Sequence, residues 1–233
     1  MDFADLHVVV TGGTGALGRA VVAALIEAGA TCHIPYRSES EAERFPFRDH
    51  AQAKLYPNSE LGDERSVDRL FERIPTLWAS IHLAGSFAFG SHRDLTEATL
   101  RRQIETNLVT CALCCRGALR AFARSGQDGR IVNVAARPAL EWRNGSNMAA
   151  YAASKAAVAA LTVALAEEVA KEGVLVNAVA PSVMDTPANR MDMPKADFTA
   201  WPKVEEVART ILFLASPANK VTRGAVVPVY GKA

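Results

Sequence analysis

The first apolar run of the chain leads directly into a glycine-rich turn. Residues 6–10 are apolar and largely β-branched, the letters TGGTGALG occupy positions 11–18, and a helical run continues to about Ala28. A strand, a glycine turn and a helix in this order form a loop that binds a pyrophosphate, because glycine allows close backbone approach and the helix start offers free N–H groups. The alternative is a tight turn in which glycine serves packing alone. We favour nucleotide binding, since four glycines fall within positions 12–18.

Strand-like and helical runs alternate along the rest of the chain. Strands separated by helices predict a parallel sheet with helices on both faces. The chain has 233 residues, enough for one such domain with a buried core. Further strands are expected at 31–36, 51–56, 77–83, 130–134, 174–179 and 225–229, and helices at 64–74, 99–123, 151–171 and 205–214.

The composition argues against two classes of partner. The net charge is +1, with 49% hydrophobic and 22% charged residues, which favours neither nucleic acid nor an anionic membrane. No apolar segment is expected to approach the ~18 residues that a membrane-spanning helix needs, and no leader pattern is seen before the first strand. We therefore expect a cytoplasmic protein that acts on a small molecule.

Four cysteines are present, at positions 32, 111, 114 and 115. Cys111 and Cys114 form a C-x-x-C pattern, which can indicate redox or metal chemistry. They lie in an apolar helical run, 108–119, without a second Cys/His pair. The sequence therefore favours small buried hydrophobic side chains and predicts no metal site.

The end of the second predicted strand bears on the cofactor. A site selective for NAD places an acidic residue about 20 residues after the glycines to bind the ribose 2′-hydroxyl. Here the strand ends in Tyr36 and Arg37, and a guanidinium can pair with a 2′-phosphate. This favours NADP(H) over NAD(H), although Glu39 and Glu41 lie close by.

Tyr151 and Lys155 are four residues apart at the start of a predicted helix. That spacing places both side chains on one helix face. A nearby ammonium favours the phenolate, so Lys155 is expected to lower the pKa of Tyr151 toward the working range of an acid catalyst. The alternative is a surface tyrosine beside a solvated lysine.

Several landmarks recur in a fixed order along the chain. They are the glycine loop, Ala84-Gly85, Asn107, Tyr151 with Lys155, NAVAP at 177–181, and Asp185-Thr186-Pro187. Together these landmarks resemble the short-chain dehydrogenase/reductase family over essentially the whole length of the chain. This resemblance implies a Rossmann-type, doubly wound parallel α/β sheet of about seven strands in a single domain, residues 1–233, with a substrate loop at about 182–203. One small departure is that Ala16 stands where the family has glycine, with Gly15 one place early.

The resemblance also implies residue roles. Tyr151 would be the general acid, Lys155 would bind the nicotinamide ribose, and Asn107 would hold a water that links Lys155 to solvent. Thr186 and Val183 would meet the nicotinamide carboxamide, and Glu60 falls near the adenine. The implied cofactor-binding residues are Gly12, Gly13, Thr14, Gly15, Ala16, Leu17, Gly18, Arg37, Glu60, Ala84, Gly85, Asn107, Tyr151, Lys155, Pro181, Val183 and Thr186.

One departure from the family concerns the substrate. After the strand at 130–134 the family usually has a serine that binds the substrate carbonyl, but this chain reads Ala135-Ala136-Arg137. Loss of such a donor removes about 2.7–4 kcal/mol of transition-state stabilisation for an ordinary ketone. Ser146 and Asn147 are the candidate substitutes, although both also suit a loop.

The dihydropteridine reductases, a branch of this family, lack that serine, and the chain is similar to them in three places. These are the glycine loop, the segment 84–90 with Phe87, and the segment 185–201 with Arg190. A quinonoid dihydropterin accepts a hydride and a proton without forming an alkoxide, and Phe87 could stack on its flat ring. The branch usually carries an acidic residue where this chain has Tyr36-Arg37.

Three functions are compared on this basis. The leading hypothesis is an NAD(P)H-dependent reductase of a flat conjugated substrate, and the second is a carbonyl reductase or alcohol dehydrogenase. The third is a non-catalytic NADP-binding regulatory protein.

A homodimer or homotetramer is expected through the apolar helices at 99–123 and 151–171. The candidate substrate residues are Phe87, Ala135, Ser146, Asn147 and Arg190.

Overall fold

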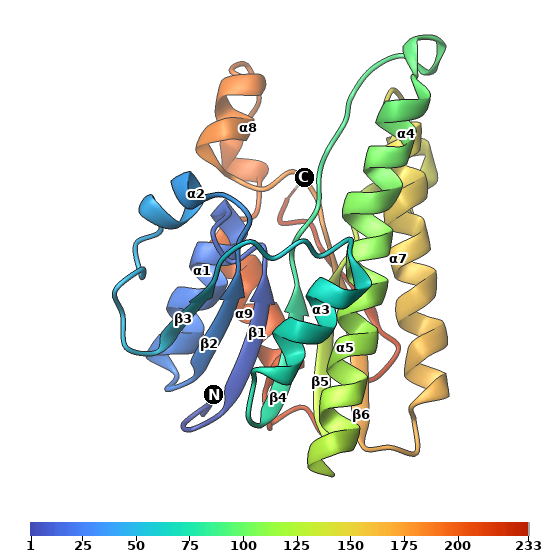
Figure 1. Cartoon of the computed structure of the whole chain (residues 1–233). Helices are drawn as coiled ribbons and strands as arrows, with labels where there is room; N and C mark the ends of the chain where they lie inside the picture. The colour runs from blue at the N-terminus through green and yellow to red at the C-terminus, as the bar shows by residue number, and fades with distance from the viewer. Residues whose placement is uncertain (233) are drawn as a thin grey trace.

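Seven parallel strands form one sheet in the order β3-β2-β1-β4-β5-β6-β7 (Figure 1). The structure is a computed structural model that describes residues 1–232. The predicted doubly wound parallel sheet of about seven strands is confirmed. The strands are β1 (His7–Thr11), β2 (Thr31–Pro35), β3 (Ala53–Tyr56), β4 (Leu77–His82), β5 (Gly129–Val134), β6 (Val174–Pro181) and β7 (Val226–Val229).

Helices cover both faces of this sheet. The helices α1 and α9 pack on one face, and α3, α5 and α7 pack on the other (Figure 1). Boundaries differ from the predicted ones by one to three residues, as expected where helix and strand ends fray. The helices are α1 (Ala16–Glu27), α2 (Glu39–Glu43), α3 (Glu64–Glu72), α4 (Glu97–Ile104), α5 (Thr110–Ser125), α6 (Arg137–Leu140), α7 (Ala149–Glu168), α8 (Pro187–Asp192) and α9 (Val204–Ala215).

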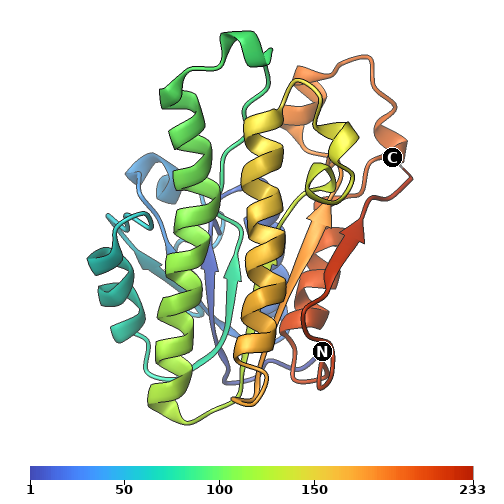
Figure 2. The same cartoon turned by 90° about the vertical axis from the view of Figure 1, so that its right-hand side faces the viewer.

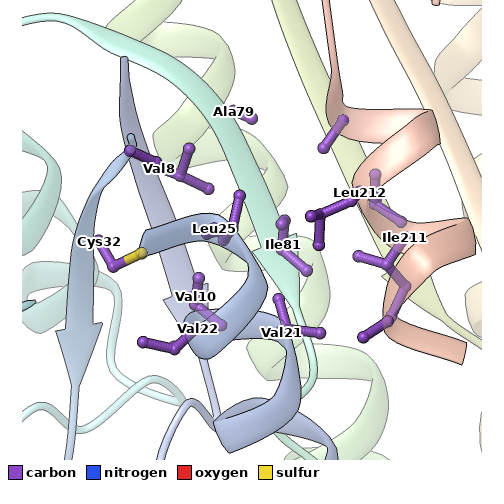
Figure 3. Packing of buried hydrophobic residues seen from close by; sticks show 14 of the residues in the cluster. Val8, Val10, Val21, Val22, Leu25, Cys32, Ala79, Ile81, Ile211 and Leu212 are labelled. Carbon is purple, nitrogen blue, oxygen red and sulfur yellow. The ribbon is translucent and has the colours of Figure 1, made fainter. Parts of the chain in front are cut away.

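The core under α1 explains why β1 reads as a continuous apolar run. A strand in a parallel sheet is covered on both faces, so residues of both parities are buried. Val8, Val9 and Val10 are all fully buried. Val8 and Val10 pack with α1 and α9 residues such as Val21 and Ile211 (Figure 3), whereas Val9 belongs to the cluster on the opposite face.

The strand order reverses between β1 and β4, and this point positions the site. The chain leaves β1 for α1 on one face, whereas it leaves β4 toward α4 and α5 on the other, so the two connections diverge and leave a crevice at the carboxyl ends. Gly12 follows β1 with a φ of 66°, and a Cβ there would lie 2.8 Å from the backbone N of Ala84, which follows β4. Glycine is therefore required where the two loops meet.

The predicted single helix at 99–123 is interrupted. It begins earlier, at Glu97, and α4 and α5 are joined by a π-helical segment, Glu105–Val109. One rod results, and it lies beside α7 (Figure 2). A π turn inserts an extra residue into a helix and changes the faces that its side chains share, which the apolar pattern of the sequence did not reveal.

The segment 182–203 is more ordered than the predicted irregular loop. Thr186 caps α8 by accepting a hydrogen bond from the backbone N of Asn189, and Pro187 occupies the first helical position. Asp185 and Lys203 form an isolated parallel bridge that closes the base of the segment.

The expectation that no segment has the length and apolarity of a membrane span is wrong for α7. This helix has 20 residues and a mean hydropathy of 1.5 over its most apolar window, sufficient by length and composition alone. Core helices of parallel α/β proteins meet the same criterion, and α7 packs on β6 with Val158, Thr162 and Ala166 buried.

Candidate active site

A pocket of about 310 Å³ opens at the crevice between β1 and β4. Seven of the predicted cofactor-binding residues line it, in segments that follow four strand ends, and their role in binding a cofactor stays a prediction. These residues are Gly12, Thr14, Gly15, Arg37, Glu60, Ala84 and Gly85.

The glycine loop has an exposed part and a buried part. Gly15 and Ala16 are exposed at the start of α1, where the first N–H groups of a helix lack intrahelical acceptors and can receive a phosphate. Gly13, Leu17 and Gly18 are buried behind the loop. A Cβ on Gly18 would lie 2.1 Å from the carbonyl oxygen of Gly12, so this residue supports the turn instead of lining the pocket.

Arg37 lines this pocket beside Tyr36, at the end of β2. Its side chain is exposed and takes part in none of the salt bridges found within residues 1–232. Tyr36 donates its hydroxyl proton to Glu39 at 2.9 Å, which restrains one of the two nearby glutamates. Glu41 lines the pocket with Arg37.

Several lining residues were missed by the sequence analysis. Ser59 and Leu61 follow β3 directly, and the rule that parallel strands gather their carboxyl ends at one edge could have identified them. Thr106 and Thr110 come from the π-helical segment and the start of α5, and no sequence pattern marked them.

Lys155 is buried at the base of the site. Its Nζ donates a hydrogen bond to the carbonyl oxygen of Val134, the last residue of β5, at 2.8 Å. A Cβ on Gly85 would lie 3.4 Å from this Nζ. Burial lowers the pKa of Lys155 to about 8, and the nearby Cys111 acts in the opposite direction.

Tyr151 differs from expectation in its acidity. Burial raises the pKa of Tyr151 to about 12, whereas Lys155 was expected to lower it. That expectation is wrong for this state of the protein, because the Lys155 ammonium is directed to the carbonyl oxygen of Val134. At neutral pH the phenol is therefore protonated, which is the form that a general acid requires.

Asn107 connects two of the segments that form the site. Its Oδ1 accepts a hydrogen bond from the backbone N of Ser86 at 2.8 Å, and its Nδ2 donates to the carbonyl oxygen of Ser86 and to Oγ of Ser154. Ser154 in turn donates to the carbonyl oxygen of Tyr151. Asn107 thus holds the loop after β4 against α7, and the predicted water-binding role stays a prediction.

An aromatic side chain contacts Tyr151. The ring of Phe87 meets the ring of Tyr151 edge-on, with centroids 4.9 Å apart and planes at 83°. Phe87 is nevertheless 58% exposed, so most of its surface is open to a ligand. The role of Phe87 in substrate binding stays a prediction.

The positions near Tyr151 offer few groups that could donate a hydrogen bond to a substrate carbonyl. Ala135 and Ala136 are buried and carry no polar side-chain group. Asn147 adopts a left-handed conformation, with φ of 59°, and its carbonyl oxygen accepts a hydrogen bond from the N–H of Gly90. Its backbone therefore joins two loops, while Ser146 is exposed.

The remaining predicted residues lie on the chain after β6. Pro181 is the last residue of β6, and Val183 is partly exposed. The Thr186 hydroxyl is used as a helix cap. Arg190 donates two hydrogen bonds to Asp185 and stacks over Phe198, so its guanidinium serves the loop.

The chain is similar to known proteins in sequence and in fold. A family model described as short chain dehydrogenase matches residues 6–197. The chain is 34% identical to cis-4-hydroxycyclohexanecarboxylate dehydrogenase of Sinomonas cyclohexanicum, over 98% of this chain and 96% of that protein. It is also 34% identical to galactitol 2-dehydrogenase of Rhizobium johnstonii, over 95% and 92% of the two chains. The solved structure titled "ElxO with NADP Bound" has the same fold, with a TM-score of 0.87, 23% identity and 97% of each chain covered.

The pKa of Lys155 leads to a pH prediction. We expect kcat/KM for reduction to fall above about pH 8, because deprotonation of Lys155 removes the charge that stabilises the phenolate formed as Tyr151 gives up its proton. The measurement is a profile from about pH 6.5 to 9.5 of the wild type, of Lys155→Arg, and of Lys171→Arg as a control at an exposed lysine. The arginine at 155 should move the falling limb to higher pH. A flat wild-type profile, or a limb unchanged in Lys155→Arg, would contradict the assignment.

Proposed function

The chain belongs to the short-chain dehydrogenase family, and from this premise we propose that it is an NADP(H)-dependent reductase of a flat, conjugated ring of the quinonoid dihydropteridine kind. Membership of this family makes the chain an NAD(P)-dependent oxidoreductase. The non-catalytic alternative is set aside because the matched relatives are dehydrogenases.

The observation that carries the substrate proposal is the environment of Tyr151. Its edge contacts the exposed ring of Phe87, whereas β5 leads into two buried alanines where the family usually has a hydroxyl donor. This site has a proton donor and an aromatic ring but no side chain that hydrogen-bonds a substrate carbonyl. It therefore suits a conjugated hydride acceptor that never forms an alkoxide. A flat ring can stack on Phe87, and such aromatic contacts contribute about 0.5–1.5 kcal/mol beyond area burial.

The residues present fit a dinucleotide cofactor. The glycine turn leaves no room for a Cβ at Gly12, and Gly85 brings the backbone close to Asn107 and Lys155, so the crevice is bounded by main chain. A bound nicotinamide cofactor supplies the hydride. Gly15 and Ala16 would bind its phosphates, and Arg37 would bind the adenosine 2′-phosphate.

The proton would come from Tyr151. Its phenol stays protonated at neutral pH, and its hydroxyl would donate the proton to a substrate bound beside Phe87. Lys155 would stabilise the resulting phenolate, while its bond to the carbonyl oxygen of Val134 holds the ammonium in the buried base of the site. Asn107 would position both groups by fixing the loop after β4 against α7.

The experiment that tests the proposal compares acceptors and cofactors. Oxidation of NADPH and of NADH is followed with quinonoid dihydropterin and with 4-oxocyclohexanecarboxylate, a ring ketone. We expect kcat/KM for the pterin to exceed that for the ketone by about 10², given the missing carbonyl donor. Tyr151→Phe should lower the pterin rate by about 10²–10⁴. Absence of pterin turnover with either cofactor would refute the substrate proposal and leave the family membership intact.

A second candidate is a carbonyl reductase or alcohol dehydrogenase. Both relatives named above are dehydrogenases of alcohols by their names, and one acts on a hydroxylated ring. Under this alternative the ketone would be the better acceptor, and Ser146→Ala or Asn147→Ala would impair its reduction. Faster turnover of the ketone than of the pterin would favour it.

Arg37 provides a test of cofactor preference. We expect Arg37→Ala to lower kcat/KM for NADPH by about 10–100-fold, since a hydrogen bond to a charged group contributes about 1.5–3 kcal/mol. The value for NADH should stay within about threefold, because NADH lacks the phosphate. Arg48→Ala, at another exposed arginine, is the matched control. Equal losses for the two cofactors would argue against a role in recognising the 2′-phosphate.

The oligomer proposed from the sequence rests on the outer face of α4, α5 and α7. Val163 on α7 is 45% exposed and Leu100 on α4 is 40% exposed, and the two helices lie side by side (Figure 2). We expect light scattering to show at least a dimer at micromolar concentration. Val163→Glu should shift it to the monomer, whereas Val221→Glu, at an exposed position outside these helices, should not. A monomeric wild type would contradict the proposal.

The cytoplasmic location expected from the sequence stays a prediction.

A further inference from the structure

Beneath the active site lies a buried cluster formed by His82, Cys111, Cys115 and Asn133. His82 is the last residue of β4, Asn133 lies on β5, and the cysteines are one turn apart on α5. All four are at most 5% exposed. A ring nitrogen of His82 and the two Sγ atoms lie within 4.8 Å of one another. The sequence directed attention to Cys111 and Cys114, but the structure brings Cys115 to Cys111 and adds a histidine from a distant strand.

The Oδ1 atom of Asn133 is the focus of this cluster. It lies 2.8 Å from Nδ1 of His82, 3.3 Å from Sγ of Cys111 and 3.6 Å from Sγ of Cys115. Cys115 Sγ also lies 3.6 Å from Nδ1 of His82. Four atoms that can bind a metal ion therefore face one another in a fully buried place.

We propose that Nδ1 of His82, Sγ of Cys111, Sγ of Cys115 and Oδ1 of Asn133 form a tetrahedral site for a thiophilic divalent cation of the zinc class. Such a cation prefers thiolate and imidazole ligands, which three of the four residues supply. The neutral carbonyl oxygen of Asn133 lies at the fourth position of the cluster. Two thiolates balance the charge of the cation, so the occupied site is neutral, as a buried site must be.

One distance already matches this coordination. With Zn–S near 2.3 Å and Zn–N near 2.0 Å, a tetrahedral site separates sulfur and nitrogen by about 3.5 Å. The structure has 3.6 Å between Sγ of Cys115 and Nδ1 of His82. The other atoms need adjustments on the order of 1 Å or less. The histidine and cysteine ligand atoms lie within 4.8 Å of one another, and the 2.8 Å between Nδ1 of His82 and Oδ1 of Asn133 must lengthen to about 3.3 Å. A cysteine rotamer change and a small rotation of the histidine ring supply these movements.

The residues around the cluster already orient the ligands. Nε2 of His82 lies 2.8 Å from Oγ of Ser80, so the ring can donate there and leave Nδ1 free to bind a metal. Nδ2 of Asn133 donates to Oγ1 of Thr162 at 2.9 Å, which directs Oδ1 toward the cysteines. Outer partners of this kind fix the tautomer and the orientation of metal ligands.

An ion here would brace the base of the active site. Cys111 lies four residues after Asn107 on the same helical rod, and Asn133 precedes Val134, whose carbonyl oxygen holds Lys155. The ion would therefore join α5 to β4 and β5 directly below the groups that fix Tyr151. Because its ligands are buried, the ion would enter as the chain folds, and binding would add to stability.

Cobalt(II) is the probe that tests the site. The full chain is unfolded under reducing conditions and refolded with cobalt chloride, and its absorption spectrum is recorded. We expect one cobalt per chain, with thiolate-to-cobalt charge transfer in the near ultraviolet and the strong visible bands of tetrahedral cobalt. Cys115→Ser should lose these bands. Cys114→Ser should keep them, because Cys114 is buried on the same helix but lies outside the cluster.

Thermal unfolding supplies a second readout. Zinc in large excess over its dissociation constant should raise Tm by on the order of 5 °C in the wild type and in Cys114→Ser, and not in Cys115→Ser. If the serine variants fail to refold, the wild-type spectrum alone decides. Absence of the thiolate bands from refolded wild type, or equal bands in a folded Cys115→Ser, overturns the proposal.

Discussion

A buried primary amide is the constraint on which the site depends. The side chain of Asn107 is enclosed at the point where the loop after β4, the central rod and α7 meet. A buried amide without partners costs about 1–3 kcal/mol, so the three segments are held in the one arrangement that satisfies it. The same arrangement sets Gly85 against Lys155 and fixes the backbone of Tyr151 through Ser154. Orientation of the acid thus follows from satisfying the buried amide of Asn107.

Burial sets the electrostatics of the two reactive groups. It raises the pKa of Tyr151 and lowers that of Lys155, so both neutral forms are favoured before a ligand arrives. The carbonyl oxygen of Val134 accepts a hydrogen bond from Nζ of Lys155 and so favours the charged form of this lysine. Phosphates and sugar hydroxyls entering the crevice would shift the balance toward the charged lysine. Cofactor binding and proton donation are therefore expected to be coupled through Lys155.

The sequence predicted the parallel sheet and its helices on both faces, because apolar strands alternate with helices along the chain. The doubly wound arrangement and the residues expected at the pocket were implied by the resemblance to a family, and the strand order was not predicted. The environment of Lys155 was not predictable, since its acceptor, Val134, is 21 residues away and reaches it through tertiary packing. The cysteine cluster was missed for the same reason. Cys114 completes the familiar sequence spacing, yet on a helix the residue four places after Cys111 shares its face.

The π-helical segment at Glu105–Val109 sets the rotational phase of everything that follows it on the rod. Removal of one residue there would restore a regular helix and turn α5 by about 100° relative to α4. Cys111 and Cys115 would then leave the sheet, while Gln103, buried before the segment, would keep its place. The length of this short segment is therefore constrained separately from the identity of Asn107 within it. A single-codon deletion would separate the amide of Asn107 from the residues below it even if Asn107 itself were kept.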